Sequence, residues 1–147
     1  MSKKKTFRDQ KDQPGPGLLL ARAARKWSRA LDASLGELDL SPTLHALLDG
    51  IERLSSDGEP ITQTRLARAT HLDVMLASKA LRTLEERGLI EREDHPGDTR
   101  AKDLGLTKEG IAVLKRAHKI VGKLEDEMFT QAGFTDKHRK TISSLLD

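Results

Sequence analysis

The fold of this chain is decided by the stretch DVMLASKALRTLEERGLIEREDHPGDTRAKDLGLTKEG, which runs from Asp73 to Gly110. Asp73 has the side chain of a helix N-cap, and apolar residues then recur at helical spacing and are expected to face a core: Val74, Ala77, Leu81 and Leu84. Gly88 is expected to end this helix in the left-handed conformation. Residues 89–93 and 102–106 read as two short strands. The intervening DHPGDTRA then forms a wing, so the stretch predicts a helix followed directly by a hairpin.

The other face of this helix and the tip of the hairpin carry the side chains expected to contact DNA. Met75 or Leu76 would pack on a thymine methyl group, and polar or cationic side chains would reach base edges or phosphates. Arg100 would enter the minor groove, while His95 and Asp98 shape the wing. The candidate DNA-binding residues are Thr62, Thr64, Met75, Leu76, Ser78, Lys79, Arg82, Arg92, Arg100 and Lys102.

Capping residues and turns place further helices on both sides of this stretch. Ser41 and Pro42 predict a helix start, and the SSDGEP segment predicts a loop from Ser55 to Pro60. A short helix follows to about Ala69, capped by Thr62 or Thr64, and Thr107 is expected to cap the last long helix. The fold class is therefore mainly α (α+β), a winged helix-turn-helix with N- and C-terminal dimerisation helices.

Two apolar seams lie outside the winged helix-turn-helix. One comprises Leu20, Ala24, Trp27, Leu31, Ser34 and Leu38, and the other Leu114, Ala117, Val121, Leu124 and Met128. Their alternating spacings of three and four resemble coiled-coil seams, and they exceed what one small core needs. We therefore expect the first and last helices to pair with those of a second copy. The expected organisation is a flexible basic tail (1–17), an N-terminal dimerisation helix (18–40), the winged helix-turn-helix (41–106) and C-terminal dimerisation helices (107–147).

Composition excludes several classes of protein. The chain has no Cys, and its five His show no metal-ligand spacing in the sequence, so no metal site and no cofactor are expected. Aromatic residues make up 3%, too few for an RNA-binding aromatic platform. No catalytic constellation or phosphate-binding Gly-rich loop is recognisable, which argues against an enzyme. Without an apolar run of about 20 residues or a signal-peptide core, a cytoplasmic protein without membrane contact is expected.

The positive charge is concentrated at the start of the chain. Residues 1–30 hold nine Lys and Arg against two Asp, whereas the whole chain has a net charge of +3, so residues 31–147 carry −4. The predicted reading helix and wing are therefore not a basic patch. DNA binding there has to depend on a few placed side chains, and the tail contributes separately.

The chain resembles the MarR (multiple-antibiotic-resistance regulator) family of winged-helix transcription factors. The resemblance rests on LDLSPTLHALL (38–48), TQTRLARATHLD (62–73), SKALRTLEERGLIER (78–92) and HPGDTRAKDLGLTKEG (95–110). The last segment is the most specific, because it holds Asp98 and Arg100 in the family's Asp-x-Arg wing signature, followed by a Leu-Thr-x-x-Gly signature that ends at Gly110. Two departures are Met75 and Leu76 at the start of the reading helix, and Thr99 in place of an arginine.

This resemblance implies a triangular homodimer that binds double-stranded DNA through the helix from Asp73 to Arg87, with Arg100 in the minor groove. It implies a regulator, most often a repressor, that acts on a pseudo-palindromic operator and is released in many relatives by a small aromatic ligand. Trp27 and His45 are the candidate residues for such a ligand cleft, although each also fits a purely structural place on its helix. The alternative is a winged-helix module that binds protein without sequence-specific DNA binding, which the charge balance of the reading region leaves open.

Overall fold

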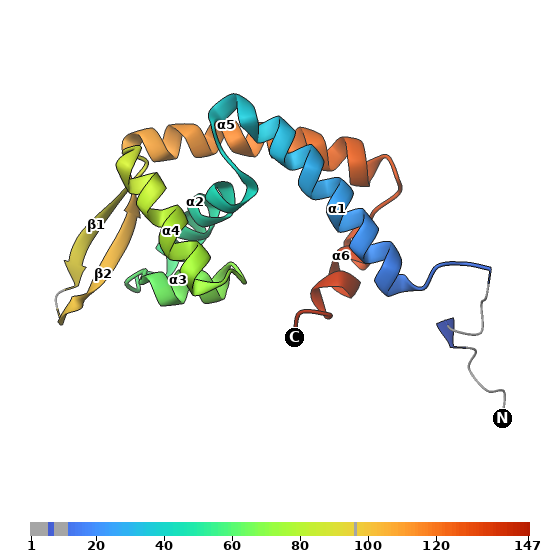
Figure 1. The fold of residues 1–147 in the computed structure, drawn as a ribbon, viewed down its shortest axis with the longest axis horizontal. Helices are drawn as coiled ribbons and strands as arrows, with labels where there is room; N and C mark the ends of the chain where they lie inside the picture. Colours follow the sequence, from blue (N-terminus) through green and yellow to red (C-terminus); the bar gives the residue numbers. More distant parts are fainter. Residues whose placement is uncertain (1–5, 8–11, 96) are drawn as a thin grey trace.

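The structure, a computed structural model, describes residues 6–7, 12–95 and 97–147, with the side chains of residues 95 and 98–101 outside that description. It has an elongated shape in which a compact head and a protruding hairpin lie at one end (Figure 1). The head comprises α2 (Pro42–Leu54), α3 (Gln63–Ala69) and α4 (Val74–Glu86), with the antiparallel hairpin of β1 (Ile90–His95) and β2 (Asp98–Leu106) beside them. These elements form the predicted winged helix-turn-helix.

Two long helices connect this head to the other end of the molecule. α1 (Pro16–Leu35) packs against α5 (Lys108–Glu125), and α5 also contacts α2 and β2. We call α1 and α5 the stem. A short 3-10 turn (Gly36–Leu38) joins α1 to the head, and a π-helical turn (Asp126–Thr130) continues α5 toward α6 (Asp136–Ser143), which folds back below the stem (Figure 1).

One leucine-rich core holds the head to the stem. Leu35, Leu47, Leu66, Leu81 and Leu114 are fully buried and come from five different helices. Burial of each such side chain stabilises the fold by about 1.5–3 kcal/mol relative to exposure. The relative placement of stem and head is therefore fixed by side-chain packing.

Aromatic rings form a second cluster at the far end of the stem. The Trp27 ring on α1 lies 5.3 Å from that of Phe129, and Phe129 lies 5.3 Å from Phe134, between ring centroids. The rings are tilted, an arrangement that the quadrupoles of aromatic rings favour. Trp27 thus joins the first helix to the turn that follows α5.

The predicted helix caps are confirmed. The Ser41 side chain accepts a hydrogen bond from the Leu44 amide, and Thr62, not Thr64, caps α3 by accepting from the Arg65 amide. Thr107 caps α5 by accepting from Gly110 N at 3.0 Å. Gly88 has a φ of +68°, the left-handed conformation expected after the reading helix.

Three predicted features differ from the structure. α1 begins at Pro16, two residues before the expected boundary, since proline at the first helical position needs no amide donor. Val74 is 47% exposed instead of buried, because it is the first residue of α4, whose buried residues begin one turn later at Ala77. The predicted wing loop is largely strand, since ladder pairing extends β1 to His95 and begins β2 at Asp98.

The seams are also used differently from the prediction. Leu31 and Leu38 on one side, and Leu114 and Ala117 on the other, are buried within this single chain. α1 and α5 therefore pack on each other first, and only their remaining apolar residues are available to a second copy. Among the described residues, no helix combines the length and apolar character needed to cross a membrane.

Candidate nucleic-acid interface

α4 begins with a strong cap that presents its first turn to solvent. Asp73 Oδ1 accepts hydrogen bonds from the amides of Met75 at 2.9 Å and Leu76 at 3.0 Å. These amides have no partner within the helix, and the carboxylate also suits the positive end of the helix dipole. The cap therefore fixes where the reading helix starts and which residues stand at its exposed end.

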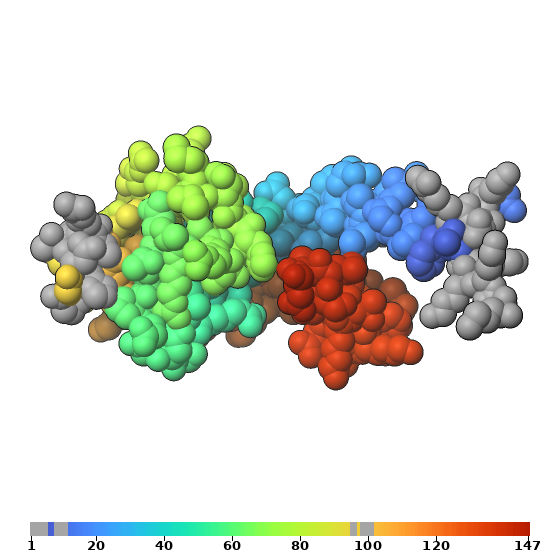
Figure 2. Space-filling view, turned by 90° about the horizontal axis from the view of Figure 1, so that it is seen from below, coloured from blue at the N-terminus to red at the C-terminus, as the bar shows by residue number. Residues whose placement is uncertain are grey.

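The side chains of α4 divide into a buried and an exposed face. Ala77, Leu81 and Leu84 are fully buried, which anchors the helix to the head. On the other face Met75 is 78% exposed, Lys79 and Arg82 are exposed, and Ser78 is half-buried. In the space-filling view from below, α3 and α4 together form the surface of the head (Figure 2). The structure thus brings the predicted contacts of α4 onto one open surface.

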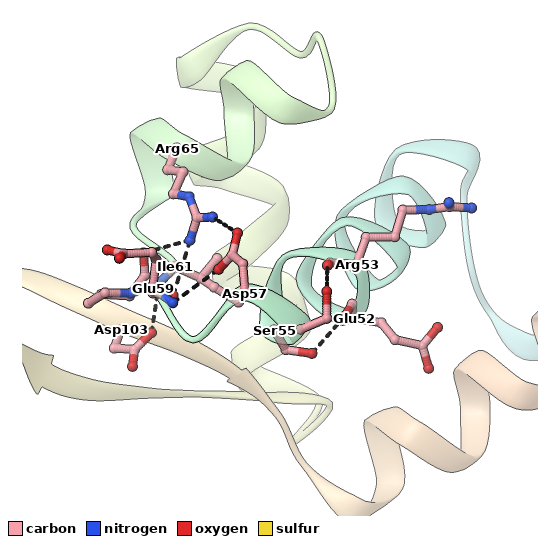
Figure 3. A network of polar contacts seen from close by, with 10 residues as sticks. Glu52, Arg53, Ser55, Asp57, Glu59, Ile61, Arg65 and Asp103 are labelled. Atoms are coloured by element: carbon pink, nitrogen blue, oxygen red, sulfur yellow. Dashed lines mark hydrogen bonds and ion pairs between the residues drawn. The ribbon is translucent and has the colours of Figure 1, made fainter.

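A polar network fixes α3 against the wing (Figure 3). Arg65 on α3 pairs with Asp57 and donates to the carbonyl oxygens of Glu59 and Pro60, both at 3.1 Å. Ile61 accepts from Leu104 N at 2.9 Å and donates its own amide to Asp103 Oδ1 at 2.8 Å. The segment before α3 is therefore hydrogen-bonded to β2. Thr64 is exposed on α3, and the Thr62 hydroxyl is occupied as the cap.

The hairpin has a regular base and an irregular tip. Its register pairs Ile90 with Leu106 and Asp94 with Lys102, and then shifts so that His95 opposes Asp98. Residues 99–101 are therefore extra residues in β2, as in a bulge, a feature that bends a hairpin. The backbone of Arg100 lies in this irregular part near the tip, whereas the side chains of His95, Asp98 and Arg100 lie outside the described set.

Two predicted DNA contacts of the wing are paired with carboxylates. Arg92 Nε lies 3.0 Å from Glu85 Oε2 on α4, and only 21% of the Arg92 side chain is exposed. Lys102 forms an exposed ion pair with Asp94 across the hairpin. Arg92 thus ties the wing to the reading helix, while Lys102 remains at the surface. An exposed ion pair such as Lys102–Asp94 stabilises the fold by less than about 1 kcal/mol. A DNA phosphate could therefore replace Asp94 as the partner of Lys102.

The start of α5 packs closely against the turn between the reading helix and the wing. The Thr107 hydroxyl donates to the Gly88 carbonyl at 2.6 Å, and the Thr107 amide donates to the Leu89 carbonyl at 3.1 Å. A Cβ atom added to the buried Gly110 would lie 2.0 Å from the Leu89 carbonyl oxygen. The Leu-Thr-x-x-Gly segment is therefore a structural clamp that fixes the wing against the stem.

The cap of α4 provides a test that separates folding from DNA binding. Replacing Asp73 by alanine is expected to destabilise the fold by about 1 kcal/mol, because two amides lose their acceptor. Asp73→Asn keeps an acceptor and removes a negative charge near the DNA, so it should preserve the melting temperature and raise DNA affinity several-fold. Thermal denaturation and DNA titration of the two variants check this, and equal melting temperatures for both would contradict the role of the cap.

A cavity of about 610 Å³ lies between α1, α2 and α5 and brings Trp27 and His45 together. Its wall also includes Asp49, Arg53 and His118. Burial lowers the pKa of His45, so its ring is uncharged near neutral pH. Burial opposes ionisation of Asp49, but hydrogen bonds with Arg53 and His118 outweigh this and hold its pKa below the usual range.

The same cavity brings together two carboxylates and an imidazole that the sequence patterns did not single out. Asp49 and Glu52 on α2 and His118 on α5 place one donor atom each within 4.8 Å of one another. Asp49 follows His45 by four residues and precedes Glu52 by three, which puts all three on one side of a helix. That spacing could have been noticed, but no sequence pattern indicated that His118, 66 positions beyond Glu52, would join them.

Comparisons with known proteins agree with this fold. Residues 40–102 match the model of the MarR family. Over 131 residues, covering 89% of both chains, the protein is 36% identical to the uncharacterized HTH-type transcriptional regulator YdcH of Bacillus subtilis (strain 168).

Two solved structures bound to DNA have similar folds. A mutant MarR from E. coli complexed with operator DNA has a TM-score of 0.72 and 27% identity, covering 88% of this chain and 89% of that one. The S. aureus MepR–DNA complex has a TM-score of 0.72 at 22% identity, covering 89% and 91%, and this shows a shared fold alone. Together with the winged helix-turn-helix described above, the sequence relationship shows that this chain belongs to the MarR family of transcriptional regulators.

Proposed function

We propose that this protein is a homodimeric, sequence-specific DNA-binding repressor that reads a pseudo-palindromic operator. The observation that carries the proposal is the open surface of α4, where Met75, Lys79 and Arg82 stand on one exposed face beside the wing. The width of the major groove admits a helix, so the capped first turn of α4 can reach base edges. The E. coli relative bound to operator DNA supports the same use of the fold.

The proposed contacts have distinct roles. Lys79 and Arg82 neutralise phosphates or bind guanine, whereas exposed Met75 and Leu76 pack on thymine methyl groups. Arg100 near the hairpin tip is proposed to enter the minor groove. The basic segment at the start of the chain adds affinity that does not depend on sequence.

Exposed apolar residues at the start of α1 and after α6 support the proposed homodimer. Leu18, Leu19 and Leu20 begin α1, and Leu145 and Leu146 follow α6, all of them exposed in the single chain. A second copy would bury this apolar surface in a symmetric interface. Two reading helices would then contact half-sites about 34 Å apart, one turn of the DNA helix.

Salt dependence tests the DNA-binding part of the proposal. If a dimer neutralises about eight phosphates, the logarithm of affinity should fall against the logarithm of salt concentration with a slope of about −7. Gel-shift or anisotropy titrations with DNA from the promoters of its own and neighbouring genes measure this slope. Absent or salt-insensitive binding would favour the alternative, a winged-helix module that binds protein.

Release by a small aromatic ligand stays a prediction of the family resemblance. The cavity beside Trp27 and His45 has room for such a ligand. Its charge, however, is unfavourable for an aromatic acid, since three carboxylates (Asp49, Glu52, Glu125) and one guanidinium (Arg53) line it. A neutral phenol fits this lining better than an anion does.

A further inference from the structure

We propose that Asp49, Glu52 and His118 form a binding site for a divalent transition-metal cation, with Zn²⁺ the best match. Metal binding at this site goes beyond the proposed function, because it does not depend on whether the protein binds DNA.

The distances between the donor atoms suit a shared cation. His118 Nε2 lies 3.1 Å from Asp49 Oδ1 and 3.8 Å from Glu52 Oε2. Two ligand atoms that each lie about 2.1 Å from a tetrahedral Zn²⁺ are about 3.4 Å apart. Small side-chain adjustments would therefore bring all three donors into coordination without movement of the helices.

His45 is a second, independent sign that the site lacks a partner. Its Nε2 atom is buried and makes no hydrogen bond with the part of the chain that the structure describes. The ring stands edge-on to His118, with centroids 6.1 Å apart, and lines the same cavity. A buried imidazole nitrogen without a partner is costly, and a cation-bound water would satisfy it.

The surroundings hold the ligands in place. Arg53 Nε donates to Asp49 Oδ2 at 2.6 Å, which leaves Oδ1 turned toward His118. Such a contact to a ligating carboxylate orients the ligand, as outer-shell contacts do in metal proteins. The excess of carboxylates in the cavity wall also favours a cation over an anion.

The donor set selects among cations. Imidazole nitrogen together with carboxylate oxygen suits Zn²⁺ and other transition metals, whereas Mg²⁺ and Ca²⁺ require oxygen ligands. A bound cation would link α2 of the head directly to α5 of the stem, two helices already in contact. Binding to the folded state alone would therefore raise thermal stability.

Zinc titration of the full, untagged chain tests the site. After treatment with a chelator, competition between the protein and a chromophoric zinc indicator should show one Zn²⁺ per chain, with a dissociation constant on the order of micromolar or tighter. His118→Ala and Asp49→Ala should each weaken binding at least about tenfold. Excess Mg²⁺ should leave Zn²⁺ binding unchanged.

Two control variants distinguish this site from adventitious binding. Glu125→Gln alters the charge of the same cavity outside the three ligands, and His138→Ala removes an imidazole on α6. Both should keep zinc affinity within about threefold of the parent, a difference of less than about 0.7 kcal/mol. Thermal denaturation in the chelator confirms that each variant folds.

The outcomes separate this proposal from the proposed function. Absence of saturable zinc binding, or affinity unchanged in His118→Ala and Asp49→Ala, overturns the metal site even if promoter DNA is bound. Zinc binding without any DNA binding overturns the proposed function alone. The fluorescence of Trp27, the single Trp, reports on occupancy by phenol or benzoate, and saturable binding of these with no zinc binding assigns the cavity to an aromatic ligand instead.

Discussion

Replacing Gly110 by alanine is expected to lower the melting temperature by about 6–12 °C, the equivalent of about 3 kcal/mol for a domain of this size. The added methyl carbon would lie 2.0 Å from the Leu89 carbonyl oxygen, far closer than van der Waals contact. That oxygen belongs to backbone and already accepts the Thr107 amide, so it cannot simply turn aside. Differential scanning calorimetry measures the change.

Gly122→Ala is the matched control in the same helix. A Cβ atom at Gly122 meets nothing within 4 Å among the described residues, so alanine should stabilise α5 by about 0.5–1 kcal/mol through its higher helix propensity. Opposite signs for the two substitutions would show that close packing, not helix propensity, requires glycine at position 110. A melting temperature that Gly110→Ala leaves unchanged would contradict the clamp between wing and stem.

The double variant Lys79→Ala/Arg82→Ala is expected to reduce affinity for operator DNA on the order of 100-fold, because direct contacts to bases or phosphates each contribute about 1–3 kcal/mol. A dimer would lose four cations, so the slope of log affinity against log salt should become less negative by about 3 to 4. Both side chains are exposed, and the fold should retain its stability. Fluorescence anisotropy at several salt concentrations measures both quantities.

Arg116→Ala/Lys119→Ala is the control for this pair. These cations are exposed on α5, which belongs to the stem and lies away from the face formed by α3 and α4 (Figure 1). The variant has the same net charge as Lys79→Ala/Arg82→Ala. Equal loss of affinity in both would assign DNA binding to overall charge and remove α4 from the mechanism.

The local parts of this fold were predictable from the sequence because local chemistry determines them. Ser41, Thr62, Asp73 and Thr107 each act through amides within three residues, and a cap of this kind is visible in the order of residues. The left-handed glycine after α4 is equally local. The helix starts are therefore correct to within about two residues, whereas the first helix ends at Leu35, five residues before the expected boundary at residue 40.

Features that depend on partners far away in the sequence were predicted poorly. The segment DHPGDTRA has turn-forming residues, yet backbone pairing across the hairpin makes most of it strand. The seam spacing predicts that Leu114 and Ala117 face a second copy, but both are buried within this chain, where α5 contacts α1, α2 and β2. Here tertiary contacts override the local pattern.

The candidate site shows the same division. The exposed face of α4 followed directly from helical periodicity, and the structure places Met75, Lys79 and Arg82 on it. The ion pair between Arg92 and Glu85 depends on how the wing folds back on α4, and the approach of His118 to Asp49 depends on how α5 crosses α2. No local sequence pattern predicts either contact.

Hydroxyl-radical footprinting on promoter DNA most directly tests the claim that α4 and the wing read an operator. Two protected patches are expected, whose centres lie about one helical turn, 10–10.5 base pairs, apart. Both patches should disappear in Lys79→Ala/Arg82→Ala and persist in Arg116→Ala/Lys119→Ala. Uniform protection, or two patches that survive loss of Lys79 and Arg82, would show that α4 does not read the operator.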